Sequence, residues 1–435
     1  EHLHDFLRDN DHSRFTYETR SSSREFCNAL MTENFNWDND ARVSEWIRNQ
    51  GWYFTFWDSD PTVSSMLKMI DEIHKKFKGR QDFYHLLVNE NEPVITFQFL
   101  NLEEFNLTDD LYIKMNSRGK PLTAFENFKA KFEGNIKDIF KDNPKTYKAN
   151  WLENREVSVS DYFSFKIDTE WLSHFWKLSK SSPKKVDGYL MNFIRTILTA
   201  WYASNDSTSN CSISQKVDDK SLFLQVLLGT KRIDGQNKDE DLDFYIYEKI
   251  GSVTADSVTE LIAAFDAIVN FNQDDRKLIS EYQFDLIKIQ RKVVEGSVTN
   301  QERLLFHAFV QYLIHHGHDL PSISKWMRVV FNLVENTRVE FEQLEGGFEE
   351  LTKLTHHAPN ILEHLCQSET KISSFYSQQV IEEKIKSHLI LKHPEWADLV
   401  KYLEGNSFNR GQIGYLLEFS GIWEFFKRNK NCNFS

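Results

Sequence analysis

The spacing of apolar and polar positions changes partway along the chain. Residues 14–20 (RFTYETR) alternate between aromatic and ionic side chains, which predicts a half-buried strand with one charged face. Residues 94–100 (VITFQFL) and 111–115 (LYIKM) predict two further strands. Residues 60–77 begin with Asp-Pro and predict a helix. Residues 1–133 are therefore predicted to mix strands and helices.

From residue 134 onward the apolar period is that of helices, and strand signals almost vanish. The predicted helices span residues 184–203, 257–271, 275–294, 300–316, 323–336, 378–391 and 394–404. The polar stretches 204–220 and 230–241 predict surface loops. The predicted fold class is α+β, predominantly α, with a small mixed domain over residues 1–133 and a helical domain over residues 134–435.

Composition and charge narrow the function classes. The net charge of −13 disfavours wrapping by nucleic acid, although a local basic patch can still contact phosphates. Four widely separated cysteines disfavour a zinc ribbon or a disulfide framework and predict a reduced, cytoplasmic protein. No apolar run approaches the roughly 18 residues of a membrane span. The aromatic cluster at residues 52–57 (WYFTFW) predicts core packing, with base stacking as the less favoured interpretation.

One strand-to-helix junction combines cations with a helix start. In YIKMNSRGKPLTAFENFKAKFE, residues 112–133, the strand ends before a turn over residues 116–121 and a helix follows to about residue 140. Thr123 and Glu126 have the spacing of a capping box. Phe125, Phe128 and Phe132 share one face of this helix, and Lys129 can pair with Glu126 and Glu133 on the other.

The residues of this turn suit a bound anion. A helix start carries unpaired N–H groups and about half a positive charge. Arg118 and Lys120 add two cations, and Gly119 permits close backbone approach, as in turns that hold phosphates. The turn does not have the pattern of a Walker A loop.

A second junction has similar features where RFTYETR runs into SSSREF. Ser22 and Glu25 have capping-box spacing, and Arg20 and Arg24 flank them. If the two strands are neighbours, both helix starts face one pocket. The candidate phosphate contacts are therefore Arg20, Arg24, Asn116, Arg118, Gly119 and Lys120. The simpler interpretation, in which both junctions are ordinary capped helices with surface arginines, stays open for each.

Other candidate sites are weaker. The string His315–Asp319 closes a predicted helix, where histidines favour the dipole without any metal, and no metal site is predicted there. Arg328, Asn332 and Glu335 form a polar row opposite the apolar stripe of Trp326 and its neighbours. That row predicts either a contact with a ligand or with the first domain, or a solvated face.

Several of these segments resemble one known family. RFTYETRSSSREF, LTDDLYIKMNSRGKPLTAFENFKA, KIDTEWLSHFW, WMRVVFNLVENT and WADLVKYLEGNSFNRGQIGYLL are similar to the GmrSD-type restriction endonuclease N-terminal-domain family. The resemblance implies a ParB/sulfiredoxin-like nucleotide-hydrolysing domain followed by helices. The family's Asp-Gly-Gln-Gln-Arg loop is absent, so we expect a fragment, with residues 1–133 a partial domain that is inactive alone. Asn116, Arg118, Gly119, Leu122, Thr123 and Glu126 match the family's second motif.

The resemblance also implies a role. It predicts a bacterial defence protein in which binding and hydrolysis of NTP, with Mg²⁺ as cofactor, control DNA restriction or sensing. The implied partners are the nucleotide, DNA and a nuclease domain or subunit, and no membrane. A Glu-His-x-x-Pro nuclease core is not recognisable, because Glu363 to Gln367 lacks the proline and lies in a helical stretch. The alternative function is a non-catalytic helical scaffold that binds a partner protein or DNA.

Overall fold

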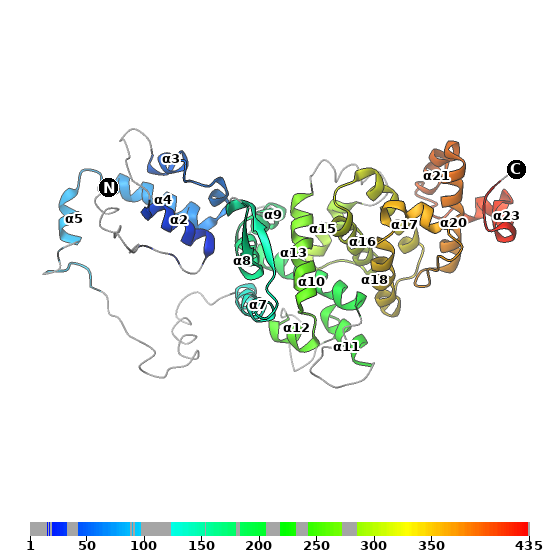
Figure 1. The fold of residues 1–435 in the computed structure, drawn as a ribbon, viewed down its shortest axis with the longest axis horizontal. Coiled ribbons are helices and arrows are strands. Elements are labelled where there is room, and N and C mark those ends of the chain that lie inside the picture. The colour runs from blue at the N-terminus through cyan, green and yellow to red at the C-terminus, as the bar shows by residue number, and fades with distance from the viewer. Residues whose placement is uncertain are drawn as a thin grey trace. The chain divides into compact units, whose positions relative to one another are not determined.

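The computed structural model describes residues 15, 17, 20–32, 42–87, 89, 92–96, 123–152, 154–179, 183–205, 218–231, 242–271 and 285–433. The chain forms two compact units, Glu1–His174 and Phe175–Ser435, and Figure 1 shows the elements of both. Helices dominate the described residues, which confirms the predominantly α fold class.

The described part of the first unit consists of helices and one hairpin, and α9 crosses the boundary between the units. In chain order its elements are α2 (Ser21–Thr32), α3 (Val43–Arg48), η1 (Thr55–Ser59), α4 (Pro61–Phe77), α5 (Gln81–Leu87), α7 (Ala124–Ile139), β1 (Thr146–Ala149), η3 (Asn150–Leu152), β2 (Arg155–Ser158), α8 (Val159–Asp168) and α9 (Glu170–Leu178).

An aromatic core joins α2, α3 and α4. Trp57 is buried and packs edge-to-face against Phe26 and Tyr53, with ring centroids 5.4 Å apart in both pairs. Phe15 and Tyr17 pack against the same core, which agrees with the predicted buried face. The described residues of the predicted strand 14–20, which are Phe15, Tyr17 and Arg20, are not in a strand, so the strand prediction is wrong for them. The prediction that residues 52–57 serve packing is therefore confirmed for Tyr53 and Trp57.

The strand predictions fare less well than the helix predictions. Residues 111–115 and 97–100 lie outside the described residues, and residues 94–96 are not in a strand. Among the described residues the sheet is an unpredicted antiparallel hairpin of β1 and β2, in which Tyr147 lies opposite Val157. The predicted helical region beyond residue 134 did not include these two strands, because each strand has four residues, too few for a clear alternation.

The second unit consists of helices. They are α10 (Pro183–Ser204), α11 (Asp218–Leu227), α12 (Phe244–Ile250), α13 (Ala255–Asn270), α15 (Leu286–Glu295), α16 (Asn300–His316), α17 (Leu320–Glu335), α18 (Phe341–Thr355), η6 (Ala358–Asn360), α19 (Ile361–Leu365), α20 (Ser377–Lys392), η7 (Pro394–Trp396), α21 (Ala397–Glu404), α22 (Gly414–Phe419) and α23 (Ile422–Asn429). None of the described helices is long and apolar enough to span a membrane.

Helix α16 is central to this unit and contacts α13, α15, α17 and α18. Phe193 of α10 packs on Phe265 of α13 at 4.6 Å between ring centroids and on Phe306 of α16 at 6.3 Å. Trp326 of α17 donates its indole N–H to the carbonyl of Ala308 at 3.0 Å. The apolar stripe predicted around Trp326 is buried, as expected.

The C-terminal part of the second unit contains a separate apolar cluster. Ile385 and Leu389 of α20 pack with Ile413, and Trp423 and Phe426 of α23 belong to the same cluster. Helices α20 to α23 therefore have a core of their own within the second unit.

Candidate functional site

The predicted phosphate contacts fall into two groups. Asn116, Arg118, Gly119 and Lys120 lie outside the described residues, so their convergence with the other junction stays a prediction. Arg20 and Arg24 are described. They lie one turn apart, because the N–H of Arg24 donates to the carbonyl of Arg20 at 2.9 Å at the start of α2.

A buried carboxylate, Asp60, joins the starts of α2 and α4. It is the N-cap of α4, and its Oδ1 accepts the N–H of Thr62 at 2.7 Å. Its Oδ2 accepts the hydroxyls of Ser22 and Ser23 at 2.5 and 2.8 Å. Arg20 places Nη1 3.7 Å from Oδ1 of Asp60 and donates to Oγ1 of Thr62 at 3.0 Å. One carboxylate thus compensates a cation and holds two helix starts together.

This arrangement corrects the capping box predicted for Ser22 and Glu25 at the start of α2. Ser22 lies inside α2 and directs its hydroxyl to Asp60, so it does not cap the helix. The physical reason is that a fully buried carboxylate requires donors, and two adjacent serines supply them. Sequence reasoning treated Asp60 only as a helix start and missed this partner.

Glu25 has an unusual environment on the same helix. Burial raises its pKa to about 7, Arg24 opposes this rise, and Asp161 of α8 adds to it. A carboxyl that titrates near neutral pH in a domain with clustered cations marks a candidate functional position.

At the other junction, the described start of α7 agrees with the prediction from the sequence. Thr123 Oγ1 accepts the N–H of Glu126 at 3.2 Å, and Glu126 Oε2 accepts the N–H of Thr123 at 2.7 Å, so the capping box is confirmed. The predicted aromatic face of α7 is buried. Lys129 pairs with Glu133 at 3.6 Å and more closely with Asp168 of α8 at 2.7 Å. Helices α2 and α7 both pack against α8.

The polar row of α17 belongs to a buried ionic network. Arg328 donates through Nη1 to both carboxylate oxygens of Glu404, at 3.0 and 2.8 Å. Asn332 donates to Glu383 and to Glu404, each at 3.0 Å. Lys386 lies 2.8 Å from Glu383, and all five side chains are buried. The interpretation of this row as a solvated face is therefore wrong for Arg328 and Asn332, because α20 and α21 cover them with carboxylates.

The charges of this network nearly balance. Lys386 also pairs with Glu382 at 2.7 Å, so two cations face three carboxyl groups. Burial raises the pKa of Glu383, and the two cations oppose this rise. Glu335, the third member of the row, pairs with Arg410. The network fixes α17, α20 and α21 to one another.

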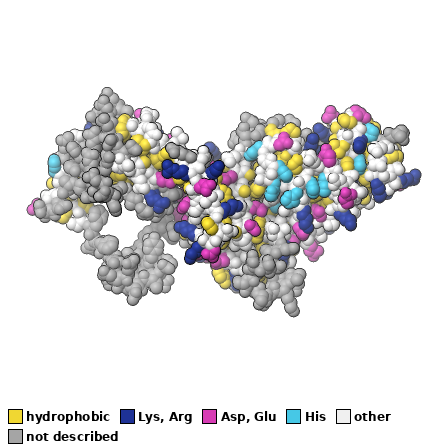
Figure 2. Space-filling view, viewed as in Figure 1, with side chains coloured by type: hydrophobic (Ala, Val, Ile, Leu, Met, Phe, Trp, Pro, Cys, Tyr) yellow, Lys and Arg dark blue, Asp and Glu magenta, His cyan; other side chains and the backbone are white. Residues whose placement is uncertain are grey.

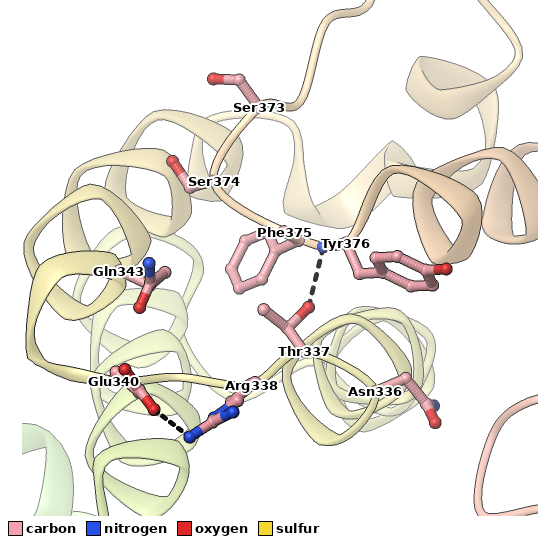
Figure 3. A pocket seen from close by; sticks show the side chains of 9 residues that line it. All are labelled: Asn336, Thr337, Arg338, Glu340, Gln343, Ser373, Ser374, Phe375 and Tyr376. Carbon is pink, nitrogen blue, oxygen red and sulfur yellow. Dashed lines mark hydrogen bonds and ion pairs between the residues drawn. The ribbon is translucent and has the colours of Figure 1, made fainter.

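A cavity of about 560 Å³ lies where α17 ends and α18 and α20 begin. Figure 3 shows the ring of Phe375 between Gln343 and Thr337. Thr337 accepts the N–H of Tyr376 at 2.9 Å. Hydroxyl and amide groups around one aromatic ring suit a small polar ligand. Neither Arg20 nor Arg24 lines this cavity.

Histidines gather on one face of the second unit, where Figure 2 shows them in cyan. The rings of His315 and His356 lie 5.7 Å apart, and those of His357 and His364 stack at 3.8 Å. Among the described residues no three His, Cys, Asp or Glu side chains are placed to hold a metal ion. His364 lies in α19, which confirms that the Glu363 to Gln367 stretch is largely helical.

A comparison with known protein families finds a match for the N-terminal part of the chain. Residues 2–133 match the family model described as GmrSD restriction endonuclease, N-terminal domain. No curated protein matches the chain, and no solved structure matches it. The matched segment contains both cationic junctions and Asp60, and it points to a restriction-type defence protein. This match identifies residues 2–133 as similar to the N-terminal domain of GmrSD restriction endonucleases.

Proposed function

We propose that the N-terminal domain binds and hydrolyses a nucleoside triphosphate and thereby controls DNA restriction or DNA sensing in a cytoplasmic bacterial defence system. The observation that carries this proposal is the family match over residues 2–133, the segment that contains both cationic helix junctions. A triphosphate is the ligand whose charge and shape suit two cationic helix starts that face one pocket.

The described geometry supports part of this proposal. The capping box at Thr123 satisfies two N–H groups, and Arg118 and Lys120 precede the positive end of the α7 dipole by only a few positions in the sequence. At the other junction Arg20 is oriented toward the start of α4 by Thr62. A phosphate there competes with Asp60 for Arg20, so we expect Arg20 to contribute less than Arg118 and Lys120.

The family resemblance implies Mg²⁺ as a cofactor. In the part of the chain that the structure describes, no three His, Cys, Asp or Glu side chains are placed to bind such an ion. Asp60 does not fit as a ligand, because its carboxylate already accepts three donors and faces Arg20. Mg²⁺ keeps several waters and is often held by phosphate oxygens with one or two carboxylates. In this proposal the ion therefore enters with the nucleotide.

Calorimetric titration of ATP and of GTP into the full chain tests the proposal. The double substitution Arg118→Glu with Lys120→Glu reverses two charges at the junction and is expected to abolish binding. Lys75→Glu with Lys76→Glu reverses the same charge on α4, where the Lys75 side chain is 78% exposed, and is expected to retain it.

Equal affinity in the junction variant and the unchanged chain would remove the proposed pocket. Absence of nucleotide binding in the unchanged chain would favour the non-catalytic scaffold instead. Release of inorganic phosphate, measured alongside the titration, separates hydrolysis from binding alone.

A further inference from the structure

The loop over residues 405–412 (GNSFNRGQ), here called the C-terminal loop, has a fixed backbone. Asn406 accepts the N–H of Phe408 at 2.9 Å, and Asn409 donates its side-chain amide to the carbonyl of Leu403 at 2.7 Å. The N–H of Gly411 donates to the carbonyl of Glu404 at 2.8 Å. These bonds define one conformation for a segment that is neither helix nor strand.

Two residues of the buried ionic network, Lys386 and Glu382, form hydrogen bonds with the backbone at this loop. Lys386 donates to the carbonyl of Gly411 at 2.5 Å, and Glu382 accepts the N–H of Ile413 at 2.7 Å. Gly411 has φ +86°, and a Cβ there would lie 2.3 Å from Oδ1 of Asn332. The burial of several charged groups costs free energy, and an apolar core would pack the helices without this cost. Here these groups position a loop, as the supporting residues of a binding site do.

The positioned loop presents aromatic side chains to solvent. Phe408 at its tip is 86% exposed, and Tyr402 of α21 is 74% exposed. Tyr415 of α22 is also exposed and its hydroxyl donates to Asn409 at 3.2 Å, which places it beside the loop. Phe419, one turn further along α22, is 94% exposed. We call Tyr402, Phe408, Tyr415 and Phe419 the aromatic surface.

Positive charge accompanies the aromatic surface. Lys401 and Arg410 are exposed beside Tyr402 and Phe408 in the sequence, and the last turn of α23 adds Lys427 and Arg428. Three of these exposed cations form ion pairs, Lys401 with Asp398, Arg410 with Glu335 and Lys427 with Glu424, for which a phosphate would compete. Residues 405–433 contain four Lys or Arg against two Glu, whereas the whole chain has a net charge of −13. Figure 2 shows dark blue side chains gathered at the end of the molecule where α23 lies.

We infer that the aromatic surface binds single-stranded or unstacked DNA, with bases stacked on Phe408 and Tyr402 and phosphates near Arg410 and the basic turn of α23. Exposed rings beside Lys and Arg are the features of sequence-tolerant single-strand binding. A protein partner is favoured less, because Lys is depleted at protein interfaces, whereas Lys401 and Lys427 accompany the rings here. This inference rests on the proposed function, since it names the surface at which a defence protein contacts DNA.

Fluorescence anisotropy with a labelled single-stranded oligothymidylate and the full chain, without nucleotide, tests the inference. Phe408→Ala is expected to weaken binding roughly 5- to 150-fold, because one stacking platform is removed. Tyr245→Ala removes another exposed aromatic ring, which is 52% exposed, from α12 and is expected to leave binding unchanged. Both side chains are exposed, so circular dichroism should be the same for all three proteins.

The salt dependence supplies a second readout. Lys427→Ala with Arg428→Ala is expected to reduce the slope of log affinity against log salt by about 0.7 for each DNA phosphate that the variant no longer neutralises. The Arg118→Glu and Lys120→Glu double variant should bind the oligonucleotide like the unchanged chain. Retained DNA binding in that variant would keep the aromatic surface even if the proposed nucleotide site fails.

Three results would overturn the inference. The first is no measurable binding of the oligonucleotide by the unchanged chain. The second is equal affinity of the Phe408→Ala variant and the unchanged chain. The third is a dimer in sedimentation experiments that Phe408→Ala dissociates while DNA affinity stays the same, because the aromatic surface would then bind a second copy of the chain.

Discussion

The guanidinium group of Arg328 lies against the carboxylate of Glu404, with Nη1 3.0 Å from Oε1 and 2.8 Å from Oε2, although 76 positions separate the two residues. Both are buried, and Arg328 also lies 3.4 Å from Glu383. A buried pair of this kind contributes little over a hydrophobic replacement, but removal of one member leaves the other charge without compensation. The pair therefore makes the C-terminal helices sensitive to single substitutions.

We predict that Arg328→Met lowers the free energy of unfolding by about 3–5 kcal/mol. The reason is that Glu404 and Glu383 then lose a cation that they cannot replace with water. Arg338→Met is the matched control, because the Arg338 side chain is 89% exposed in its pair with Glu340 and should contribute less than about 1 kcal/mol. Urea unfolding followed by tryptophan fluorescence measures both variants, and equal losses would contradict the prediction.

A second prediction concerns the close approach of the C-terminal loop to α17. Gly411→Ala is expected to destabilise the protein by about 1–3 kcal/mol, because the new Cβ meets Asn332 and the positive φ is strained for alanine. Gly134→Ala should instead stabilise it by about 0.5–1 kcal/mol, since Gly134 lies within α7 with nothing within 4 Å of the new Cβ. Thermal unfolding of both variants gives the comparison, and a neutral Gly411→Ala would show that the loop adjusts freely.

Helix positions could be predicted from the sequence because their signals are local. Helix α16 has the predicted bounds, since Thr299 and Glu302 form a capping box at its start and Gly317 follows its end. Helix α17 begins three residues earlier than predicted, at Leu320, with Pro321 in its first turn. In both cases neighbouring residues carry the information.

The polar networks could not be predicted because their partners are distant in sequence. Asn332 bonds Glu383 from 51 positions away, and Ser22 bonds Asp60 from 38 positions away. A polar row opposite an apolar stripe has the same pattern whether water or another helix covers it. In the candidate site, the capping box of Thr123 could be predicted from the sequence. The contacts of Asp60 could be recognised only in the folded structure.

The shifted pKa of Glu260 predicts that stability changes between pH 4.5 and about pH 7. Burial raises its pKa to about 7, from a usual value of 4.5, while Gln311 opposes the rise with a hydrogen bond of 2.6 Å. The folded state then favours the protonated form, so this stabilisation is complete below pH 4.5 and is lost as the pH rises to about 7. Glu260→Gln removes the charge and should stabilise the protein at pH 8 by on the order of 2 kcal/mol.

Urea midpoints at pH 5 and pH 8 check this prediction, with the difference between Glu260→Gln and the unchanged chain as the measured quantity. The difference should be larger at pH 8. If it were the same at both values, Glu260 would not titrate between them.

For His307 we predict the opposite pH dependence, in which stability is lost as the pH falls. Burial lowers its pKa from 6.5 to about 3, although a backbone hydrogen bond with Phe348 opposes this. The folded state therefore favours the neutral ring. This stabilisation is present above pH 6.5 and is lost as the pH falls toward 3, by up to about 1.4 kcal/mol per pH unit.

His307→Gln should flatten this part of the pH profile, because glutamine takes up no proton and can still reach Thr352, whose hydroxyl lies 2.8 Å from the His307 ring. Denaturant unfolding between pH 4 and pH 7 gives the slope for each protein. Parallel slopes would show that other groups cause the acid sensitivity.

Substitution of Asp60 should destabilise the protein locally, within residues 2–133, the segment that matches the family. Asp60→Ala removes the acceptor for Ser22, Ser23 and the N–H of Thr62, and it leaves two buried hydroxyls without this partner. We expect a loss of about 3 kcal/mol, the sum expected for a lost helix cap and unsatisfied buried groups. Asp82→Ala is the control, since the Asp82 side chain is 63% exposed in its pair with Arg80.

Hydrogen exchange read by mass spectrometry locates the effect of Asp60→Ala. Amides of α2 and α4 should exchange faster, because the carboxylate that joins these two helix starts is gone, while amides of α16 and α17 in the second unit should exchange as before. Uniformly faster exchange throughout the chain would mean that Asp60 supports the whole protein. Unchanged exchange in α2 would mean that the two serines find other acceptors and that Asp60 does not hold the junction together.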